Sequence, residues 1–576
     1  MQALAEKRTC HADPRVKLVG AAFLLVATGI GARLVQLQHF EHAELIAYAR
    51  RQHLVVEEIP SRPGEILDRR GRLLATTITA KSLWIDPSRI DHPQSFAQKL
   101  SGILKLDVMT LSKIISHQKN KKFVWVKRRL AETEVEAIEK LKLEEGTWGF
   151  RKEYVRVYPQ GKLAAHVIGY RDIDGKGRGG IEESRDGELR GVNGQRTMIR
   201  DARGKIIHIL DRAERMPKRG KSIVLSIDSV IQLFAEDQLD RIVEKWKPLG
   251  CSAVVVEPKT GEVLAMASRP TVDYSNPKPF DEANWTNLCL SSMYPPGSTF
   301  KPFVVAWGLD HDIFGVDETF QCEHGRYRMG RRLLRDHHSY GELSLKDVLV
   351  KSSNIGMAKI GERMGNPLLY EAAVAFGFGR PTGCELPGEQ FGILRPLSDW
   401  TGYSTGSIPM GQEIAVTPIQ LVMAHAAIAN GGTWLSPKLV LKTLENDKQT
   451  KSIGGQTVSR VASRESCDWL VKEAMREVIT RGTGRKARLE DYQVFGKTGT
   501  SQKPDPQTGK MSHTLHVGSF IGGAPVDDPK VLVLVVVDEP KGGQHHYGGT
   551  VAAPFASEIL KKTLHYLGVA ENQSRK

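Results

Sequence analysis

The stretch Tyr294-Pro295-Pro296-Gly297-Ser298-Thr299-Phe300-Lys301 decides the fold and the chemistry that we expect for this chain of 576 residues. Its Pro and Gly residues close a loop, and the apolar run 302–309 that follows predicts a helix. Ser298 then lies near the helix N-terminus, with Lys301 one turn later on the same face. A serine beside an amine at the positive end of a helix is a nucleophile with a base at hand. By itself the pattern fits a capping serine and a surface lysine better, so it needs support from elsewhere.

Two further motifs supply that support. Ser352-x-Asn354 comes next along the chain, and Lys497-Thr498-Gly499-Thr500 follows near the C-terminal end. The Lys497 motif also resembles the end of a phosphate-binding loop. Such a loop needs a glycine five residues before Gly496. Because Asp491 occupies that position, we set the nucleotide-binding interpretation aside. Together the three motifs predict a single acyl-transfer site.

The first two motifs supply the groups that move protons. Ser298 is the predicted nucleophile, and its hydroxyl needs a neighbouring base at neutral pH. Lys301 is the predicted base, with a pKa lowered by partial desolvation and by the nearby Lys497. Ser352 can relay a proton toward the leaving amine, while Asn354 can orient Lys301 and hold a substrate amide.

The third motif supplies the groups that bind substrate. Lys497, Thr498 and Thr500 offer a cation and two hydroxyls to a terminal carboxylate. Gly499 lets the strand backbone approach the ligand without a side chain in the way. The backbone N–H groups of Ser298 and Thr500 are the predicted oxyanion-hole donors, each worth roughly 3 kcal/mol.

Composition narrows the remaining function classes. The formal charge of +15 permits a nucleic-acid or anionic-membrane partner, but no zinc-finger or RNA-binding motif accompanies it. We therefore interpret the charge as spread over a solvated surface and expect no nucleic-acid partner. The pairs His545-His546 and His513 with His516 lack a metal-ligand pattern, so we expect neither a metal nor another cofactor. Six scattered cysteines permit a disulfide without requiring one.

The N-terminal region predicts a membrane anchor. Residues 1–17 are polar and contain four basic side chains, whereas residues 18–38 are mostly apolar and about as long as a bilayer requires. The positive-inside bias predicts a cytoplasmic tail, a single-pass anchor and an extracytoplasmic remainder. One alternative is a cleaved signal peptide, which the small residues Gly29, Gly31 and Ala32 would suit. The other alternative is a buried core helix.

Two domains are expected beyond the anchor. A helical stalk at residues 41–52 precedes a turn at 68–71 between two short strands. We expect residues 39–220 to form a mixed, non-catalytic domain, because no acid–base pair in them suggests a site. All three motifs fall in residues 221–568, and residues 569–576 form a polar tail.

The catalytic region reads as α+β with a mainly antiparallel sheet, because strands are followed by helices and then by strands again. The segment 531–537 is wholly apolar and predicts a central strand buried on both faces. The expected strands are 223–227, 251–257, 262–267, 494–500, 518–522 and 530–538, and the turn Pro258-Lys259-Thr260-Gly261 predicts that the second and third of them form a hairpin. The expected helices are 228–246, which is capped near Asp228, 416–430, 467–480 and 553–567.

The three motifs together resemble those of the class B penicillin-binding proteins. The resemblance covers about residues 18 to 567. Arg69-Arg70 departs from the family, which often has Arg-Asn there, while Ser352-Ser353-Asn354 is usual for class B. Other family-like segments are Arg62-Pro63-Gly64 to Ala75, Tyr158-Pro159, His166-Val167-Ile168-Gly169, Gly180-Ile181-Glu182, Phe376-Gly377-Phe378-Gly379, Leu386-Pro387-Gly388-Glu389, Gly411-Gln412, Thr417-Pro418 and Tyr547-Gly548-Gly549.

This resemblance implies a penicillin-binding transpeptidase/serine β-lactamase-like fold behind a pedestal, or dimerisation-like, domain. It implies a peptidoglycan D,D-transpeptidase on the outer side of the cytoplasmic (inner) membrane. Ser298 would attack the penultimate D-alanine carbonyl of a stem peptide ending in D-Ala-D-Ala, and a neighbouring amine would resolve the acyl-enzyme. β-Lactams would mimic that terminus and acylate Ser298. The donor peptide would lie as an added strand along Lys497–Thr500.

The resemblance is greatest to the septal FtsI type, because the tail is short, the anchor is single and no repeats follow the catalytic domain. It implies septal cell-wall synthesis during cell division, with a polytopic FtsW-type glycosyltransferase and other division proteins as partners. Three alternatives stay open: an elongation-type class B transpeptidase, a D,D-carboxypeptidase or β-lactamase, and a catalytically silent division scaffold. The anchor and pedestal argue against a free β-lactamase.

Overall fold

A computed structural model describes most of the chain and divides it into two compact units. One unit comprises Met1–Ser61 with Val192–Lys218, and the other Arg62–Gly191 with Arg219–Lys576. The functional boundary expected at residue 220 stays a prediction. The residues described are 13–200, 206–209, 215–274, 281–445, 448–452, 457–504, 511–542 and 546–571.

The first unit contains the expected anchor helix. Helix α1 (Pro14–Val35) starts at Asp13, whose carboxylate accepts a hydrogen bond from the backbone N–H of Arg15 at 3.1 Å, and it continues as a π-helical turn, Gln36–Phe40. The span Pro14–Phe40 is long and apolar enough to cross a bilayer, and it includes the predicted residues 18–38. The stalk helix is confirmed as α2 (His42–His53). An antiparallel sheet follows, in the order β1 (Leu54–Ile59), β8 (Gly194–Arg200), β9 (Ile206–Ile209).

Most of the predicted cytoplasmic tail, residues 1–12, lies outside the described residues, as do residues 572–576 of the polar tail.

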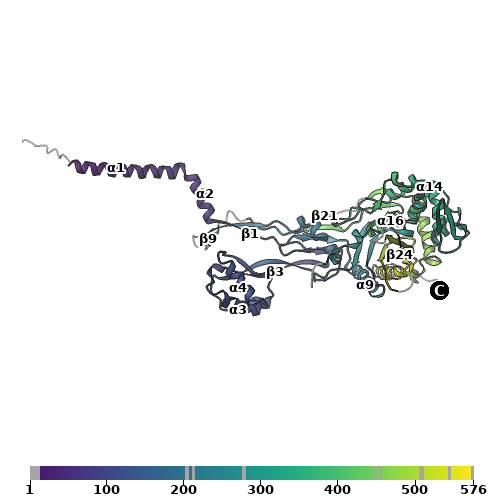
Figure 1. Ribbon diagram of the computed structural model, residues 1–576, viewed down its shortest axis with the longest axis horizontal. Coiled ribbons are helices and arrows are strands. Elements are labelled where there is room, and N and C mark those ends of the chain that lie inside the picture. Colours follow the sequence, from purple (N-terminus) through teal and green to yellow (C-terminus); the bar gives the residue numbers. More distant parts are fainter. Residues whose placement is uncertain are drawn as a thin grey trace, which may run out of the picture. The chain divides into compact units, whose positions relative to one another are not determined.

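In the second unit, a long strand, β3 (Leu73–Ile85), organises the part that the sequence predicts to be non-catalytic. The turn before it is confirmed, but the expectation of two short strands is wrong for the second one. Strand β3 has 13 residues because ten of them pair with β5 (Trp148–Val157). Its far end packs with three helices around a separate apolar core, seen beside β3 in Figure 1. Those helices are α3 (Pro93–Leu104), α4 (Val108–His117) and α5 (Glu132–Lys140), and the other paired strands are β2 (Ile66–Leu67) and β4 (Val124–Lys127).

A fully buried carboxylate connects this part to the part that contains the three motifs, which the sequence predicts to be the catalytic part. Asp68 accepts hydrogen bonds from the backbone N–H groups of Arg70 (2.9 Å), Arg72 (2.8 Å) and Ser229 (3.2 Å). Arg72 bonds to Asp68 at 2.7 Å and to Asp228 at 2.7 Å. Asp228 in turn caps helix α9 (Ser229–Trp246), as the sequence predicted. The turn at residues 68–71 therefore fixes the start of a catalytic-domain helix.

The catalytic part is built on a five-stranded antiparallel sheet with the order β12-β11-β25-β24-β23. The predicted hairpin and the predicted central strand β25 are both confirmed. Alternate β25 residues enter different cores: Leu532, Leu534 and Val536 face one side, and the intervening valines face the other. Each buried Leu or Val side chain contributes about 1.5–3 kcal/mol. The strands are β11 (Gly250–Glu257), β12 (Glu262–Arg269), β23 (Phe495–Pro504), β24 (Met511–Ala524) and β25 (Val531–Asp538).

Helices cover both faces of this sheet. Helices α9 and α20 (Ala553–Tyr566) pack together on one face, and α16 (Pro418–Ala429) packs on the other, so that α9 and α16 lie on opposite sides of β24 in Figure 1. Behind α16 lie α12 (Lys301–Asp310) and α14 (Asn354–Ala375) in the same core. The predicted helix 467–480 is continuous but has a π-helical middle, Leu470–Met475, between α17 (Arg464–Trp469) and α18 (Arg476–Thr480).

A second sheet joins the two parts of this unit. Strand β10 (Ser222–Leu225) pairs in parallel with β2 and antiparallel with β20 (Val440–Glu445), which is followed by β21 (Lys448–Ser452). The five cysteines of the described part are free and buried, so they form no disulfide with one another, and Cys10 lies outside it.

We predict that Asp68→Asn destabilises the protein by about 3–5 kcal/mol at pH 7, because it leaves Arg72 with a buried, weakened partner. Burial opposes ionisation of Asp68, but the hydrogen bonds from Arg72, Ser229 and Arg70 outweigh it and lower the pKa below 3.8. The stabilisation is therefore complete above pH 3.8 and lost as the pH falls through the lower folded value. Thermal unfolding of the full chain measures it. The exposed acid Asp91→Asn should leave the midpoint unchanged, and equal midpoints for all three proteins would contradict the prediction.

Candidate active site

Ser298 and Lys301 lie where the sequence predicted. The segment Gly297–Phe300 forms a 3₁₀ turn that leads directly into α12, which begins at Lys301. In a 3₁₀ turn, residues three apart are eclipsed, so both side chains are on one face. Ser298 is half-buried, whereas Lys301 has no exposed surface.

Four oxygen atoms surround the Lys301 amine. Its Nζ donates to the carbonyl oxygens of Ser352 (2.8 Å) and Ser353 (3.2 Å), to Ser352 Oγ (3.2 Å) and to Asn354 Oδ1 (3.0 Å). Burial disfavours the ammonium form, the Asp336 carboxylate partly offsets this, and the pKa of Lys301 is lowered to about 7. The amine therefore changes its charge near neutral pH, as a general base must.

The second motif gets its shape from a break between two helices. Helix α13 (Leu345–Val350) ends just before it, and Ser353 caps α14 by accepting a hydrogen bond from Gly356 N at 3.0 Å. Ser352 has a φ of +58°, in the left-handed region that costs a serine about 1–3 kcal/mol. This strained backbone turns the Ser352 hydroxyl toward both lysines and places Asn354 in the first turn of α14.

Lys497 joins this network from the edge strand. Its amine is also fully buried and donates to Ser352 Oγ at 2.9 Å. Burial and the nearby Lys301 amine lower the pKa of Lys497 well below 10.5. Because the two amines share one hydroxyl, their titrations are coupled, and the pair resists carrying two charges.

The other residues of the third motif face neighbouring elements. The Thr498 and Thr483 hydroxyls are 2.6 Å apart, and Thr500 Oγ1 accepts a hydrogen bond from Gly548 N at 3.0 Å. A side chain at Gly499 would meet Thr299 at 2.9 Å and Ser519 at 2.4 Å. The close approach that requires this glycine is therefore to the protein's own loop rather than only to a ligand.

The predicted oxyanion-hole residues lie beside one another. Gly297 has a φ of +57°, and a Cβ there would come within 2.9 Å of the Thr500 carbonyl oxygen. On its other side, Gly297 N donates to the Gly411 carbonyl at 3.1 Å. Strand β23 has only β24 as a neighbour in its sheet, so the other edge of β23 adjoins the Ser298 turn.

The sequence analysis missed Asp336. Its carboxylate accepts hydrogen bonds from Ser353 Oγ (2.6 Å) and from the backbone N–H groups of Asn354 (2.5 Å) and Ile355 (3.1 Å). An anion at the N-terminus of α14 is favourable, and here it fixes the second motif from outside that helix. No local sequence signal marks Asp336, because it lies 18 residues before Asn354 and reaches it only in the fold.

His425 is a second residue that the sequence did not reveal. It lies within α16, and its Nε2 donates to the Thr299 carbonyl at 2.9 Å. Burial lowers the pKa of His425 to about 3, so the ring is neutral and acts as a fixed donor. It holds the Ser298 turn against the core.

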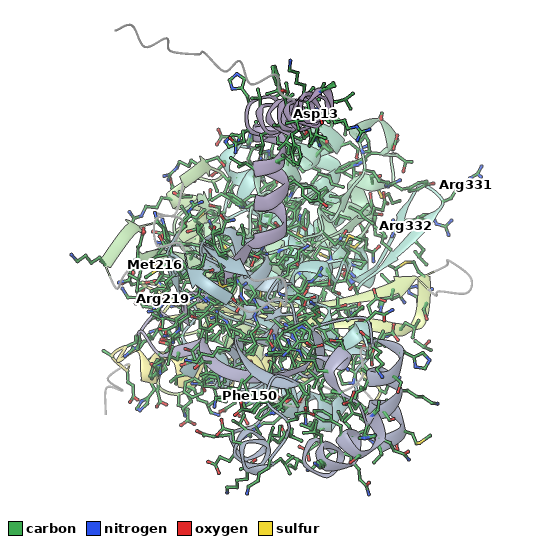
Figure 2. The ribbon with its side chains drawn as sticks, turned by 90° about the vertical axis from the view of Figure 1, so that its left-hand side faces the viewer. Asp13, Phe150, Met216, Arg219, Arg331 and Arg332 are labelled. Carbon is green, nitrogen blue, oxygen red and sulfur yellow. The ribbon has the colours of Figure 1, made fainter. Side chains whose placement is uncertain are left out.

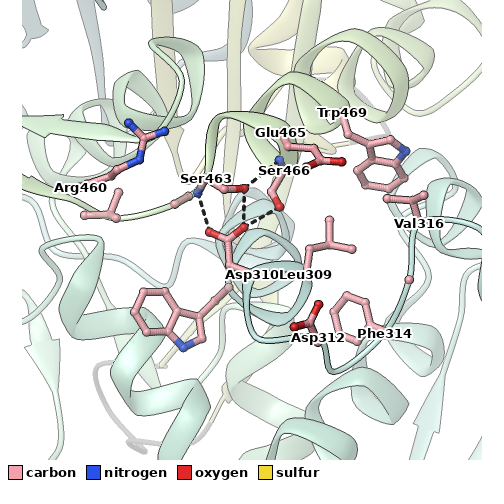
Figure 3. A pocket seen from close by; sticks show the side chains of 14 residues that line it. Leu309, Asp310, Asp312, Phe314, Val316, Arg460, Ser463, Glu465, Ser466 and Trp469 are labelled. Atoms are coloured by element: carbon pink, nitrogen blue, oxygen red, sulfur yellow. Dashed lines mark hydrogen bonds between the residues drawn. The ribbon is translucent and has the colours of Figure 1, made fainter.

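A separate hollow of about 770 Å³ lies at the opposite, C-terminal end of α12 (Figure 3). Its Asp310 carboxylate is already occupied, since it accepts hydrogen bonds from the Ser463 N–H, the Ser463 hydroxyl and the Ser466 hydroxyl, each at 2.6 Å. This carboxylate anchors the start of α17 to the end of α12.

Metal-type clusters of three or more His, Cys, Asp or Glu side chains do not occur among the described residues. His545 and the side chain of His513 lie outside them.

Comparison with known families identifies the chain. Residues 251–561, more than half of it, match the penicillin binding protein transpeptidase domain, and residues 58–225 match the penicillin-binding protein dimerisation domain. The chain belongs to the class B penicillin-binding proteins. The fold expected from the sequence, with its transpeptidase domain and preceding second domain, is confirmed for this penicillin-binding protein.

Its relatives match over nearly the whole length. "Probable peptidoglycan D,D-transpeptidase PenA" of Neisseria meningitidis is 32% identical over 98% of this chain and 94% of its own. "Peptidoglycan D,D-transpeptidase FtsI" of Escherichia coli is 29% identical over 96% of this chain and 92% of its own. Penicillin binding protein 3 of Mycobacterium tuberculosis, solved in complex with aztreonam, superposes with a TM-score of 0.69 at 26% identity, covering 89% of this chain and 98% of its own.

We predict that Asp336→Asn slows labelling of this protein by a fluorescent penicillin at least tenfold, because an amide is a weaker acceptor for the N–H groups that start α14. The initial labelling rate at pH 7.5 is the measurement. Asp317→Asn removes the same charge from an exposed site and is the control. An unchanged rate in a folded Asp336→Asn protein would show that Asp336 does not position the second motif.

Proposed function

We propose that Ser298 of this peptidoglycan D,D-transpeptidase is the nucleophile that forms an acyl-enzyme with a stem peptide ending in D-Ala-D-Ala. The Ser298 hydroxyl gives its proton to neutral Lys301 as its oxygen bonds to the penultimate D-alanine carbonyl carbon. The bond to the last D-alanine then breaks, and its nitrogen takes a proton that Lys301 passes through the Ser352 hydroxyl. The observation that carries this proposal is the buried Lys301 amine, which sits beside Ser352 and one 3₁₀ turn from Ser298.

The second half-reaction follows the same path in reverse. An amine from a neighbouring stem peptide attacks the acyl carbonyl carbon and loses a proton through Ser352 to Lys301. The bond between Ser298 Oγ and that carbon then breaks, and Lys301 returns the proton to the Ser298 oxygen. Two backbone N–H groups, those of Ser298 and Thr500, stabilise the oxyanion in both steps, and removing one such donor typically costs about 3 kcal/mol. The contact between Gly297 and Thr500 supports this pairing of donors.

The donor peptide binds along the free edge of β23. An extended peptide there gains main-chain hydrogen bonds as an added strand. Its terminal carboxylate lies near Lys497 and the hydroxyls of Thr498 and Thr500, and the negative charge favours the protonated form of Lys497. β-Lactams acylate Ser298 through the same contacts, which agrees with the aztreonam complex of the mycobacterial relative.

The cellular role that we propose is septal cell-wall synthesis during cell division. The match to FtsI of Escherichia coli over most of both chains supports this role. The span Pro14–Phe40 serves as a single-pass anchor in the cytoplasmic (inner) membrane, with the N-terminus inside and the catalytic domain outside. A polytopic FtsW-type glycosyltransferase and other division proteins are the partners, because this chain would join peptides and not polymerise glycan.

We predict that brief exposure of the full chain to benzylpenicillin adds one drug mass to Ser298, and that Ser298→Ala abolishes the adduct. Intact mass spectrometry followed by peptide mapping measures both. Ser292→Ala removes a nearby hydroxyl and should label normally. An unmodified wild-type protein with hydrolysed drug would indicate a β-lactamase, and retained labelling in Ser298→Ala would refute the assignment of the nucleophile.

We predict that the acylation rate rises about tenfold per pH unit below pH 7 and levels off above it, because only neutral Lys301 accepts the Ser298 proton. The Asp336 charge raises the pKa of Lys301, so Asp336→Asn should move the midpoint to lower pH. Stopped-flow measurements of acylation between pH 5 and 9 test this, at roughly one-unit intervals. A flat profile, or a midpoint that moves to higher pH in the variant, would argue against Lys301 as the base.

A further inference from the structure

A hairpin next to the second motif concentrates positive charge. Residues 326–335 contain five arginines, so the charge of the chain is not evenly spread, contrary to our interpretation of the sequence. The hairpin consists of β14 (Arg326–Met329) and β15 (Arg332–Arg335). Its register puts Arg326, Arg328 and Arg335 on the exposed face and Arg332 on the inner face. Figure 2 shows Arg331 and Arg332 at the edge of the molecule, with Arg331 reaching outward.

A hollow of about 710 Å³ lies under the turn of this hairpin. The hollow is shallow and open to solvent, so a ligand would lie along it rather than be enclosed. It is lined by Arg331, Arg332, Arg395, Thr401, Tyr403 and Glu413. We call it the arginine groove.

The positive charge of the arginine groove is only partly neutralised. Glu413 is the single acid in its lining, and it pairs with Arg395 at 2.6 Å. Arg332 bonds to neutral partners, the Ser407 hydroxyl and, at 3.2 Å, the side chain of Gln412. Within the part of the chain that the structure describes, neither Arg331 nor Arg332 has a carboxylate partner. Arg331 and Arg332 both line the groove, and no carboxylate of the described residues neutralises either of them, so their guanidinium groups keep donors available for an anion.

The arginine groove is also preorganised. Glu413 has a φ of +60°, a strained conformation that a non-glycine residue holds only where its surroundings enforce it. Those surroundings are Arg395 and the Ser404 hydroxyl, which donates to Glu413 at 2.8 Å. Across the groove, the Tyr403 hydroxyl accepts a hydrogen bond from Arg331 N at 3.3 Å and so fixes the hairpin turn.

Short chain segments connect the arginine groove to the active site. Glu413 follows Gly411 by two residues, and Gly411 contacts Gly297 directly before Ser298. Strand β15 starts at Arg332 and ends at Arg335, whose carbonyl accepts a hydrogen bond from Asn354 Nδ2 at 3.3 Å, and Asp336 follows. Gly411 and Glu413 are at most about 7 Å apart along the chain, since each residue spans about 3.3–3.6 Å, so the groove begins close to the turn that carries Ser298.

We propose that the arginine groove binds the free carboxylates of an acidic stem peptide, upstream of its D-Ala-D-Ala terminus. The inference rests on the proposed function for the identity of the peptide. Arg331 and Arg332 pair with these carboxylates, and the exposed Tyr403 ring packs against the peptide. Planar guanidinium groups match carboxylates in bidentate geometry, so the groove distinguishes a carboxylate from its carboxamide. It therefore selects stem peptides by the amidation state of their side carboxyls.

The test compares two fluorescent pentapeptides that both end in D-Ala-D-Ala. One carries free carboxylates at its second and third residues, and the other carries carboxamides there. Binding is measured by fluorescence anisotropy to the full chain in detergent, in a Ser298→Ala background that prevents turnover. We expect the acidic peptide to bind roughly tenfold more tightly, as one charged hydrogen bond provides, and Arg331→Gln to remove most of that preference.

Two matched variants complete the experiment. Arg328→Gln removes the same charge from the exposed face of the same hairpin and should keep the preference, whereas Arg331→Lys should retain only part of it because lysine lacks the planar fork. Thermal unfolding confirms that each variant is folded. Equal binding of the two peptides, or equal losses in Arg328→Gln and Arg331→Gln, would overturn the proposal. The proposal would also be overturned if Arg331→Gln changed the affinity of the protein for vesicles of anionic lipid but not its affinity for the peptides.

The experiments distinguish a failure of this inference from a failure of the proposed function. If the proposed function is wrong, the wild-type protein carries no benzylpenicillin adduct in the intact-mass experiment. The anisotropy experiment needs no turnover, so an arginine-dependent carboxylate preference would persist or vanish independently of catalysis.

Discussion

Two fully buried lysine amines that share the Ser352 hydroxyl set the chemistry of this protein. Water is excluded from both, so neither amine can hold its charge as a surface lysine does. Lowering the pKa of Lys301 from 10.5 to about 7 corresponds to roughly 5 kcal/mol of destabilisation of its charged form. That energy must come from the rest of the fold. In return, an amine that is normally a fixed cation can accept a proton near neutral pH.

Three elements of the fold hold these two amines and the hydroxyl in place. Strand β23 delivers Lys497 from the sheet edge, the strained turn at Ser352 delivers the shared hydroxyl, and Asp336 holds the start of α14. Close contacts leave no room for a side chain at two glycines. Gly297 lies against the Thr500 backbone, and Gly499 lies against the Thr299 side chain. Substituting either glycine would separate the elements that bring the motifs together.

The hairpin of β14 and β15 also contacts the residues that surround the buried amines. One end of β15 bonds to Asn354 and continues into Asp336, while the other end lines the arginine groove. This strand thus connects the hollow that we propose for substrate carboxylates with the residues around the Lys301 amine. In our proposal, substrate recognition and the geometry of the lysine pair depend on one element. The non-catalytic part contributes differently, since its buried Asp68 fixes the start of α9 beneath the sheet.

Local signals in the sequence were enough to predict most elements and the chemical residue types of the site. Period and composition predicted β25 as a central strand, the hairpin of β11 and β12, the apolar anchor helix and the order of the three motifs, because these signals are local. It could not give the length of β3, which depends on pairing with β5, nor the roles of Asp336 and His425, which lie far along the chain from their partners. The folded chain was needed to show which four oxygen atoms bond to the Lys301 amine and to bring Arg331 and Arg332 to the lining of one hollow. Burial and long-range contact determine pKa values and charge clustering, and neither quantity is encoded in neighbouring residues.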